Sequence, residues 1–237
     1  PLRRHPIAQL PIIDEAVEEM LAHDLIERTS SPWASNIVMV RKKDNTYRMC
    51  IDYRNLNNIT VKDSYPLPRM DACYDALGGA KFFSTLDMRS GFHQLELDKS
   101  SQEKSAFVTR RGTFKFKVLS QGMSNSPAIF QRLMDLVLAG LTWEICLAFL
   151  DDVIVMSDSF EQHVERLRTV FSRFRESKLK LRADKCALSQ KKVKFLGSLV
   201  SGDGIEPDPD KIRAVKEWPR PLCVRDVRSF VALASYY

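Results

Sequence analysis

The stretch LAFLDDVIVM, residues 147–156, is an apolar run that two adjacent aspartates, Asp151 and Asp152, interrupt at its middle. The apolar segments on either side are typical of strands that pack on a core, and a two-residue turn at the aspartates would join them into a hairpin. Aspartate is common in surface turns, so the pair alone is weak evidence for function. Adjacent carboxylates repel each other, however, and apolar neighbours remove the water that screens them. We therefore expect one raised carboxyl pKa unless a cation lies between the two groups.

A third carboxylate follows another apolar segment. FFSTLD, residues 82–87, is predicted to be a strand that ends at Asp87. Two strands that end in carboxylates can lie side by side in one sheet, and this arrangement would bring Asp87, Asp151 and Asp152 together. Carboxylate oxygens suit hard divalent cations such as Mg²⁺. The three aspartates therefore predict a two-metal site for phosphoryl transfer, and their spacing leaves a polymerase and a nuclease equally open.

The composition is that of a globular protein. The chain has 237 residues, of which 44% are hydrophobic and 28% are charged, and this balance is not typical of disorder. A net charge of +6 permits a polyanionic partner without requiring one. Five scattered cysteines and four dispersed histidines predict neither a zinc site nor a disulfide framework, which fits a reducing compartment. No secretory signal or membrane span is evident, and the initial proline suggests part of a longer protein.

Helical and extended patterns alternate along the chain. Helices are predicted over residues 12–25, from Ser126-Pro127 onward, from about Ser159 onward, and in two stretches after Pro207–Pro209 that prolines separate. A shift in composition at these prolines suggests a domain boundary. Strands are predicted for NIVMVRK and TYRMCID, for SAFVT and TFKFKV, and for FHQLELD at residues 92–98. The buried stripe of the helix that begins near Ser159 is predicted to consist of Phe160, Val164, Leu167, Phe171 and Phe174.

Seven ordered blocks give the chain a resemblance to a known family. They are SSPWASNIVMVRKKDNTYRMCIDYRNLN, YPLPRMD, FFSTLDMRSGFHQLEL, KSAFVT, LSQGMSNSPAIFQRLMD, FLDDVIVMS and KVKFLGSLVSGDGIEPDPDKI. In these blocks the chain resembles the reverse transcriptases of long-terminal-repeat retroelements, in particular those of the Ty3/gypsy group. The blocks extend over nearly the whole chain and occur in order, which makes the resemblance far more specific than a lone pair of aspartates.

The resemblance implies an α+β protein with a right-hand polymerase fold. The fingers would comprise residues 1–61 and 98–122, the palm, an antiparallel sheet backed by helices, residues 62–97 and 123–207, and the start of a helical thumb residues 208–237. The implied activity is RNA-directed DNA polymerisation on an RNA or DNA template with a primer, using two Mg²⁺ ions, with Mn²⁺ as an alternative. Implied partners are deoxynucleoside triphosphates and the ribonuclease H and integrase segments of the same polyprotein, and a dimer is a further option. The implied location is intracellular, in a cytoplasmic virus-like particle and not in a membrane.

The resemblance also assigns roles to residues. Asp87, Asp151 and Asp152 would be the catalytic carboxylates, and the Met88 backbone carbonyl would help to hold a metal ion. The implied nucleotide-binding residues are Lys42 or Lys43, Arg48, Arg89, Ser90, Phe92 and Gln121. The implied primer- and template-binding residues are Phe149, Leu150, Phe195, Leu196 and Gly197. Two residues depart from the commoner pattern, since many relatives have an aromatic residue in place of Gln121 and a tyrosine in place of Phe149.

Each of these roles has a simpler structural alternative. Arg48 could be a surface cation of a hairpin, whereas in the family it contacts the triphosphate, whose oxygens suit a planar guanidinium. Phe92 could be an ordinary core aromatic, whereas in the family it lies against the deoxyribose and excludes a 2′ hydroxyl. For the whole chain, the alternatives to an active reverse transcriptase are a catalytically silent relative that binds nucleic acid and a two-metal nuclease. The intact aspartates argue against the first, and the fingers blocks argue against the second.

Overall fold

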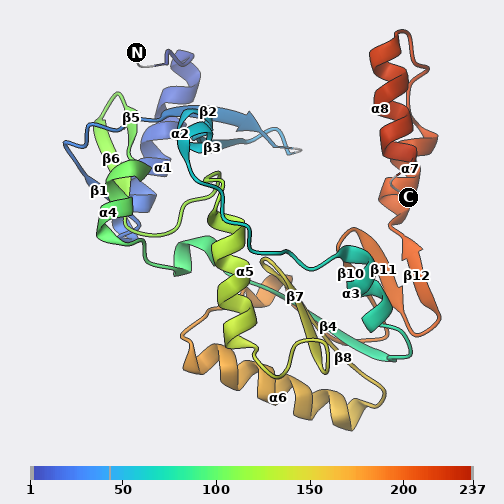
Figure 1. Ribbon diagram of the computed structural model, residues 1–237. Helices are drawn as coiled ribbons and strands as arrows, with labels where there is room; N and C mark the ends of the chain where they lie inside the picture. The colour runs from blue at the N-terminus through green and yellow to red at the C-terminus, as the bar shows by residue number, and fades with distance from the viewer. Residues whose placement is uncertain (1–2, 43, 236–237) are drawn as a thin grey trace. The chain divides into compact units, whose positions relative to one another are not determined.

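The computed structural model describes residues 3–42 and 44–235, which fall into two compact units (Figure 1). The first unit combines residues 1–67 with 89–134, and the second combines residues 68–88 with 135–237. The predicted mixture of helices with antiparallel strands is confirmed in both units.

The first unit contains two small antiparallel sheets. One pairs β2 with β3, and the other has the strand order β1-β6-β5. Its elements are η1 (Ile7–Gln9), α1 (Leu10–Ala22), β1 (Ile26–Arg28), β2 (Asn36–Arg41), β3 (Tyr47–Asp52), α2 (Arg54–Ile59), η2 (Gly91–Gln94), α4 (Lys99–Gln102), η3 (Glu103–Ser105), β5 (Phe107–Thr109) and β6 (Gly112–Phe116). The helix α5 (Ser126–Val137) continues from this unit into the second.

The core of the first unit lies between α1 and the strands. Ile13 and Val17, one helical turn apart, are buried together with Ile37 of β2 and with Phe107 and Phe114 of the second sheet. Burial of such large apolar side chains contributes about 1.5–3 kcal/mol each. The predicted hairpin of residues 36–52 is therefore attached to the rest of the unit through one face of its strands.

The second unit is built on a four-stranded antiparallel sheet with the order β7-β8-β4-β9. A separate three-stranded sheet, β10-β11-β12, lies in the same unit. The elements of the second unit are α3 (Met70–Ala76), β4 (Phe82–Asp87), β7 (Cys146–Phe149), β8 (Asp152–Ser157), α6 (Phe160–Glu176), η4 (Ala183–Lys185), β9 (Ala187–Gln190), β10 (Lys192–Phe195), β11 (Ser198–Ser201), β12 (Gly204–Pro207), α7 (Pro209–Lys216) and α8 (Val224–Ala234).

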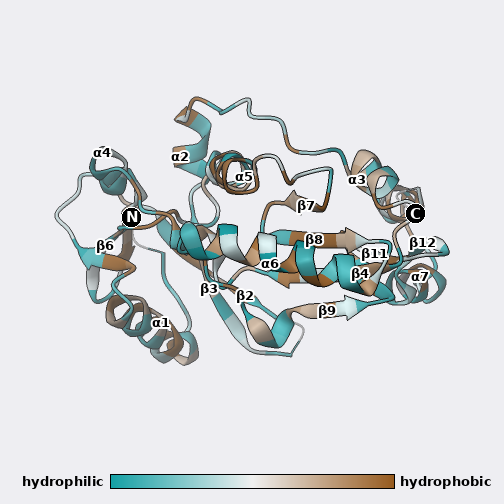
Figure 2. Cartoon of the chain, turned by 90° about the horizontal axis from the view of Figure 1, so that it is seen from below, coloured by the Kyte–Doolittle hydropathy of each residue, from teal (hydrophilic) through white to brown (hydrophobic). Residues whose placement is uncertain are grey.

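The two faces of the four-stranded sheet are covered by different elements. Side chains alternate between the faces of a strand, so Phe83 shares one face with Ile154, and this face packs against Val193 and Phe195 of β10. The other face packs against α6, where Phe82 contacts the Phe160 ring. Figure 2 shows β8 as largely apolar and α6 alongside it with a largely hydrophilic outward side.

Three local predictions need correction. The turn between β7 and β8 consists of Leu150 and Asp151, because Phe149 pairs with Asp152 and makes Asp152 the first residue of a strand. The predicted strand at residues 92–98 is wrong, because Gly91–Gln94 form a 3₁₀ helix and the following residues form no strand, only an isolated bridge between Glu96 and Val118. In α6, Phe160 is 49% exposed, whereas His163, absent from the predicted stripe, is fully buried.

Candidate functional site

The structure brings the three predicted catalytic aspartates to one end of the central strand pair. Asp87 ends β4 and Asp152 begins β8, and the two residues are direct cross-strand partners. Opposite residues of an antiparallel pair project from the same face, with Cβ atoms about 4.5–5.5 Å apart. Asp151 is the second residue of the turn that precedes β8. Two strands and one turn therefore position the three carboxylates.

Burial and charge repulsion raise the pKa values of two carboxyl groups in this cluster. Burial first, and then the charges of Asp152 and Asp87, raise the pKa of Asp151 to about 6. Burial and the charge of Asp87 also raise the pKa of Asp152. The Oδ1 atom of Asp151 is buried, yet no group among the described residues forms a hydrogen bond with it. The raised carboxyl pKa predicted from the sequence is thus confirmed, and a buried oxygen is left available for a cation.

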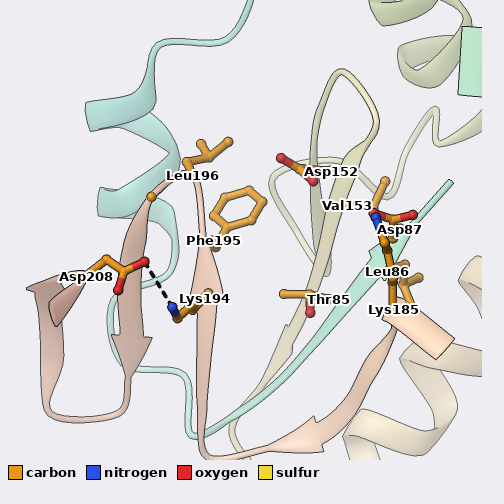
Figure 3. A pocket seen from close by; sticks show the side chains of 11 residues that line it. Thr85, Leu86, Asp87, Asp152, Val153, Lys185, Lys194, Phe195, Leu196 and Asp208 are labelled. Atoms are coloured by element: carbon orange, nitrogen blue, oxygen red, sulfur yellow. Dashed lines mark ion pairs between the residues drawn. The ribbon is translucent and has the colours of Figure 1, made fainter. Parts of the chain in front are cut away.

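A pocket of about 280 Å³ opens beside the carboxylates (Figure 3). Asp87 and Asp152 line it from β4 and β8, and Phe195 lines it from the end of β10. Leu196 and Gly197, the two-residue turn between β10 and β11, also line it. Both have positive φ angles, 48° and 84°, which matches the tight hairpin turns that favour glycine. Three of the predicted primer-binding residues therefore share a pocket with two of the predicted catalytic aspartates.

The remaining primer- and template-site predictions lie on the hairpin of the aspartates. Phe149 is the last residue of β7 and pairs with Asp152. Leu150 follows with a φ of 53°, a left-handed conformation that costs a residue with a side chain about 1–2 kcal/mol. This strained turn places Asp151 immediately before the strand that Asp152 begins.

In the first unit, two predicted nucleotide-binding residues are bonded to each other. The Arg48 guanidinium, on β3, donates a hydrogen bond to the side-chain oxygen of Gln121. Both residues line a pocket of about 380 Å³ together with His93 and Phe116. Burial and the charge of Arg48 lower the pKa of His93. His93 was not predicted to belong to this site, although its position directly after Phe92 could have suggested it.

The other predicted nucleotide-binding residues of this unit are solvent-accessible. Phe92 is half-buried, with its ring centroid 5.2 Å from that of Phe130. Arg89 and Ser90 are exposed, and Ser90 has a φ of 50° at the start of η2. Lys42 is exposed.

Lys43 lies outside the described residues. The structure therefore does not decide between Lys42 and Lys43 as the lysine that contacts the nucleotide, and this assignment stays a prediction.

Comparison with known proteins identifies the family. The model of the family described as reverse transcriptase (RNA-dependent DNA polymerase) matches residues 40–200. The chain belongs to the reverse transcriptase family. It is 40% identical to the retrovirus-related Pol polyprotein from transposon 297 of Drosophila melanogaster, over 99% of this chain and 23% of that protein. It is 37% identical to the corresponding polyprotein from transposon gypsy of the same species, over 95% of this chain and 22% of that protein.

The resemblance to Ty3/gypsy reverse transcriptases is therefore confirmed. The chain spans about a quarter of the length of the curated relatives it matches. A solved structure of a foamy viral protease-reverse transcriptase in complex with an RNA/DNA hybrid superposes with a TM-score of 0.90, at 22% identity, over 100% of this chain and 32% of that one. This likeness confirms the right-hand polymerase fold. The residue bounds for fingers, palm and thumb stay a prediction.

The carboxylate cluster of this member of the reverse transcriptase family suits a hard cation. Members of the family generally use divalent metal ions. Within residues 3–42 and 44–235, no three His, Cys, Asp or Glu side chains lie close enough together to form a ligand set as they stand. The chemistry nevertheless fits, since the donors are carboxylate oxygens, one of which is buried without a partner, and a cation would relieve their repulsion.

Several lining residues were not predicted from the sequence. Lys194 forms a 3.1 Å ion pair with Asp208, and both line the pocket beside Asp87. Lys185 lines the same pocket. Lys194 and Asp208 belong to the block 192–212 that carries the resemblance, so the block itself could have drawn attention to them. Among the described residues, no helix has the length and apolar character needed to cross a membrane.

Proposed function

We propose that this chain is the polymerase part of an RNA-directed DNA polymerase that adds deoxynucleotides to a primer 3′ end on an RNA or DNA template. One observation carries the proposal: Asp87 and Asp152 are direct cross-strand partners, with Asp151 in the adjoining turn, in a member of the reverse transcriptase family. The pairing supplies carboxylates on one face at one strand end, which a two-metal phosphoryl transfer requires.

The proposed metals are two Mg²⁺ ions, with Mn²⁺ as an alternative. Asp87, Asp151, Asp152 and the Met88 carbonyl would hold them, and the bound ions would neutralise the negative charge that develops during phosphoryl transfer. Because burial, together with the charges of Asp152 and Asp87, raises the pKa of Asp151 to about 6, a cation that binds there competes with protons. We therefore expect metal affinity to increase between pH 5 and pH 7.

The proposed nucleotide-binding residues are of two kinds: those that bind the phosphates and one that restricts the shape of the sugar. Arg48 would hold triphosphate oxygens, because its guanidinium has a neutral amide partner in Gln121 and keeps its net charge. Lys42 or Lys43, Arg89 and Ser90 would add contacts of the same kind. Phe92 would lie against the deoxyribose and exclude a ribose hydroxyl, and its half-buried ring is supported by Phe130.

The proposed primer contacts surround the carboxylates. Phe149 and Leu150 belong to the hairpin of the aspartates, and residues 195–197 share the pocket with Asp87 and Asp152. The proposed partners are a primed RNA or DNA template, deoxynucleoside triphosphates, and ribonuclease H and integrase segments of the same polyprotein, with a dimer as a further option. The proposed location is a cytoplasmic virus-like particle.

Primer extension on an RNA template with Mg²⁺ tests the proposal, using the full-length polyprotein product. Asp151→Asn should abolish incorporation while template binding, measured by fluorescence anisotropy, stays within twofold. Asp203→Asn is the matched control, because Asp203 is an exposed aspartate in the turn between β11 and β12. Absence of extension by the unaltered protein would favour the silent relative, and retained synthesis by Asp151→Asn would refute the metal role.

A further inference from the structure

His163, in the first turns of α6, is fully buried and hydrogen-bonded through both ring nitrogens. Its Nε2 atom lies 2.6 Å from Oγ of Ser84 on β4, and its Nδ1 atom lies 2.8 Å from Oγ of Ser157 on β8. All three side chains have 0% exposure. A histidine with two buried partners on two different strands connects α6 to both of them.

Two further hydrogen bonds extend this connection and determine its proton arrangement. The Ser189 backbone N–H donates to Ser84 Oγ at 2.8 Å, and Ser157 Oγ donates to the Ser159 carbonyl at 3.0 Å. Because the Ser157 hydroxyl hydrogen is used there, Ser157 Oγ accepts from Nδ1–H of His163. The Nε2 atom of the neutral ring then accepts the hydroxyl hydrogen of Ser84. The four hydrogen bonds thus form one continuous series, which runs from the Ser189 N–H through the side chains of Ser84, His163 and Ser157 to the Ser159 carbonyl. We call this series the serine–histidine chain.

The serine–histidine chain compensates for an irregularity in the sheet. The pairing of β4 with β9 changes register between Phe83 and Thr85, and Ser189 on β9 has a φ of 52°. At this point the Ser189 N–H is satisfied by the Ser84 hydroxyl. Ser189 is half-buried, and a hydrogen bond of this kind contributes about 0.5–1.5 kcal/mol, so Ser84 helps to hold β9 against β4.

The same strands set the geometry of the carboxylates. Ser84 precedes Asp87 by three residues, about 10 Å along β4, and projects from the opposite face. Asp87 and Asp152 repel each other at the end of the β4–β8 pair, and like charges directly opposite each other destabilise strand pairing. An interaction on the other face that ties both strands to α6 opposes this separation.

We propose that His163 is a positioning residue of the active site, which holds β4 and β8 together through the serine–histidine chain and so fixes the spacing of Asp87 and Asp152. The inference rests on the proposed function for its consequence in catalysis. Its consequence for cation binding does not depend on polymerase activity. Outer residues that orient metal ligands typically change metal affinity or activity 10- to 100-fold when they are replaced.

The neutral ring is the form that the serine–histidine chain requires. Protonation would place a hydrogen on Nε2, and the Ser84 hydroxyl hydrogen would lose its acceptor. Burial first, and then the charge of Arg166, lower the pKa of His163. The Arg166 guanidinium donates to the Met156 carbonyl at 2.6 Å, whereas the partners of the ring on β4 and β8 are neutral hydroxyl groups. His163 therefore stays neutral at physiological pH.

The test measures Mn²⁺ binding by electron paramagnetic resonance and kcat and KM by primer extension, in the full-length polyprotein product. His163→Leu removes both hydrogen bonds and fills the space, and we expect Mn²⁺ affinity and kcat to fall about tenfold with KM for the nucleotide within twofold. His163→Gln retains a donor and an acceptor and should restore both values to within about threefold of the unaltered protein. Val170→Ala, at another fully buried position of α6, is the control for lost stability.

Equal Mn²⁺ affinity in His163→Leu and Val170→Ala would overturn the inference, as would absence of Mn²⁺ binding by the unaltered protein. If His163→Leu does not fold, Ser84→Ala decides, because it removes one hydroxyl from the serine–histidine chain, and unchanged Mn²⁺ affinity in this variant would refute the positioning role. An unaltered protein that binds Mn²⁺ but extends no primer would contradict the proposed polymerase, while the Mn²⁺ series would still decide the role of His163.

Discussion

Two aspartates at strand ends, one in each unit, have opposite electrostatic environments. Asp52 ends β3 in the first unit, where Arg54 lies 2.6 Å away and lowers the carboxyl pKa to about 2. Asp151 precedes β8 in the second unit, where burial and two neighbouring carboxylates raise its pKa to about 6. Asp52 is neutralised within the protein. Asp151 and its neighbours are not, and this difference distinguishes a structural ion pair from a site suited to bind a cation.

The largest expected effect is on primer extension, which a substitution in the carboxylate cluster should reduce far more than a substitution of Asp52. Asp87→Asn should reduce primer extension about a thousandfold, because a metal site supplies several kcal/mol of transition-state stabilisation. Asp52→Asn should leave the rate per folded molecule within about twofold, since Arg54 and not a substrate neutralises this carboxylate. Single-turnover kinetics at saturating Mg²⁺ measures both. Similar losses in the two variants would remove the distinction.

The next effect concerns shape and not charge. Phe92→Val should admit ribonucleotides, with discrimination against them reduced about 10- to 100-fold, because a smaller side chain leaves room for a 2′ hydroxyl. The ratio of kcat/KM for the deoxy- and ribonucleotide measures the change. Phe130→Leu is the control, since Phe130 supports the same ring from a fully buried position. Unchanged sugar selectivity in Phe92→Val would leave Phe92 as a core aromatic.

A smaller effect is expected at Arg48, the cation proposed to bind the triphosphate. Arg48→Lys keeps the positive charge but loses the planar guanidinium that bonds Gln121 and suits phosphate oxygens. We expect KM for the nucleotide to increase about tenfold, with kcat changed less than threefold, in steady-state primer extension. A KM equal to that of the unaltered protein would show that charge alone suffices at this position.

The smallest expected effect is on thermal stability, where replacing Asp151 and replacing Asp52 should shift the Tm in opposite directions. Asp151 has a higher pKa in the folded than in the unfolded state, so the folded protein loses stability as pH rises from about 4 to about 6. Asp151→Asn should therefore raise the metal-free Tm at pH 7.5 by about 2–4 °C, and the gain should vanish below pH 4.

Asp52 has the lower pKa when folded, so its contribution is present above about pH 4 and is lost as pH falls towards 2. Asp52→Asn should lower the Tm at pH 7.5, by less than Asp151→Asn raises it, because the Arg54 partner is largely exposed. Differential scanning fluorimetry without divalent ions measures both variants. Shifts of the same sign would contradict the contrast between the two aspartates.

Much of the candidate site follows from local sequence patterns. The strand that ends at Asp87, the hairpin of residues 36–52 and the helix that begins with Ser126 are confirmed, because apolar periodicity and turn residues act within a few residues of the chain. The turn between β7 and β8 was placed one residue too late. Its position depends on the pairing of Phe149 with Asp152, which periodicity within one segment does not specify.

His163 illustrates a different limit of sequence analysis. An amphipathic pattern assigns histidine to the polar side of a helix, and the predicted buried stripe of α6 contained Phe160 but not His163. The structure buries His163 because Ser84 and Ser157, 79 and 6 residues away in the chain, satisfy both ring nitrogens. Hydrogen-bond partners from other strands remove the cost of burying a polar ring.

The sequence by itself determined the family and the fold class, because seven ordered blocks specify both. It also predicted Asp87, Asp151 and Asp152 as the catalytic carboxylates, because the strand patterns next to them are local. Only the tertiary structure decided that Asp87 and Asp152 are direct partners, that Arg48 forms a hydrogen bond with Gln121, and that Asp151 is the carboxyl whose burial and neighbours raise its pKa to about 6. These properties depend on distances between segments that are remote in the chain. Electrostatic repulsion and hydrogen bonding decrease steeply with such distances, so the folded arrangement alone sets their strength.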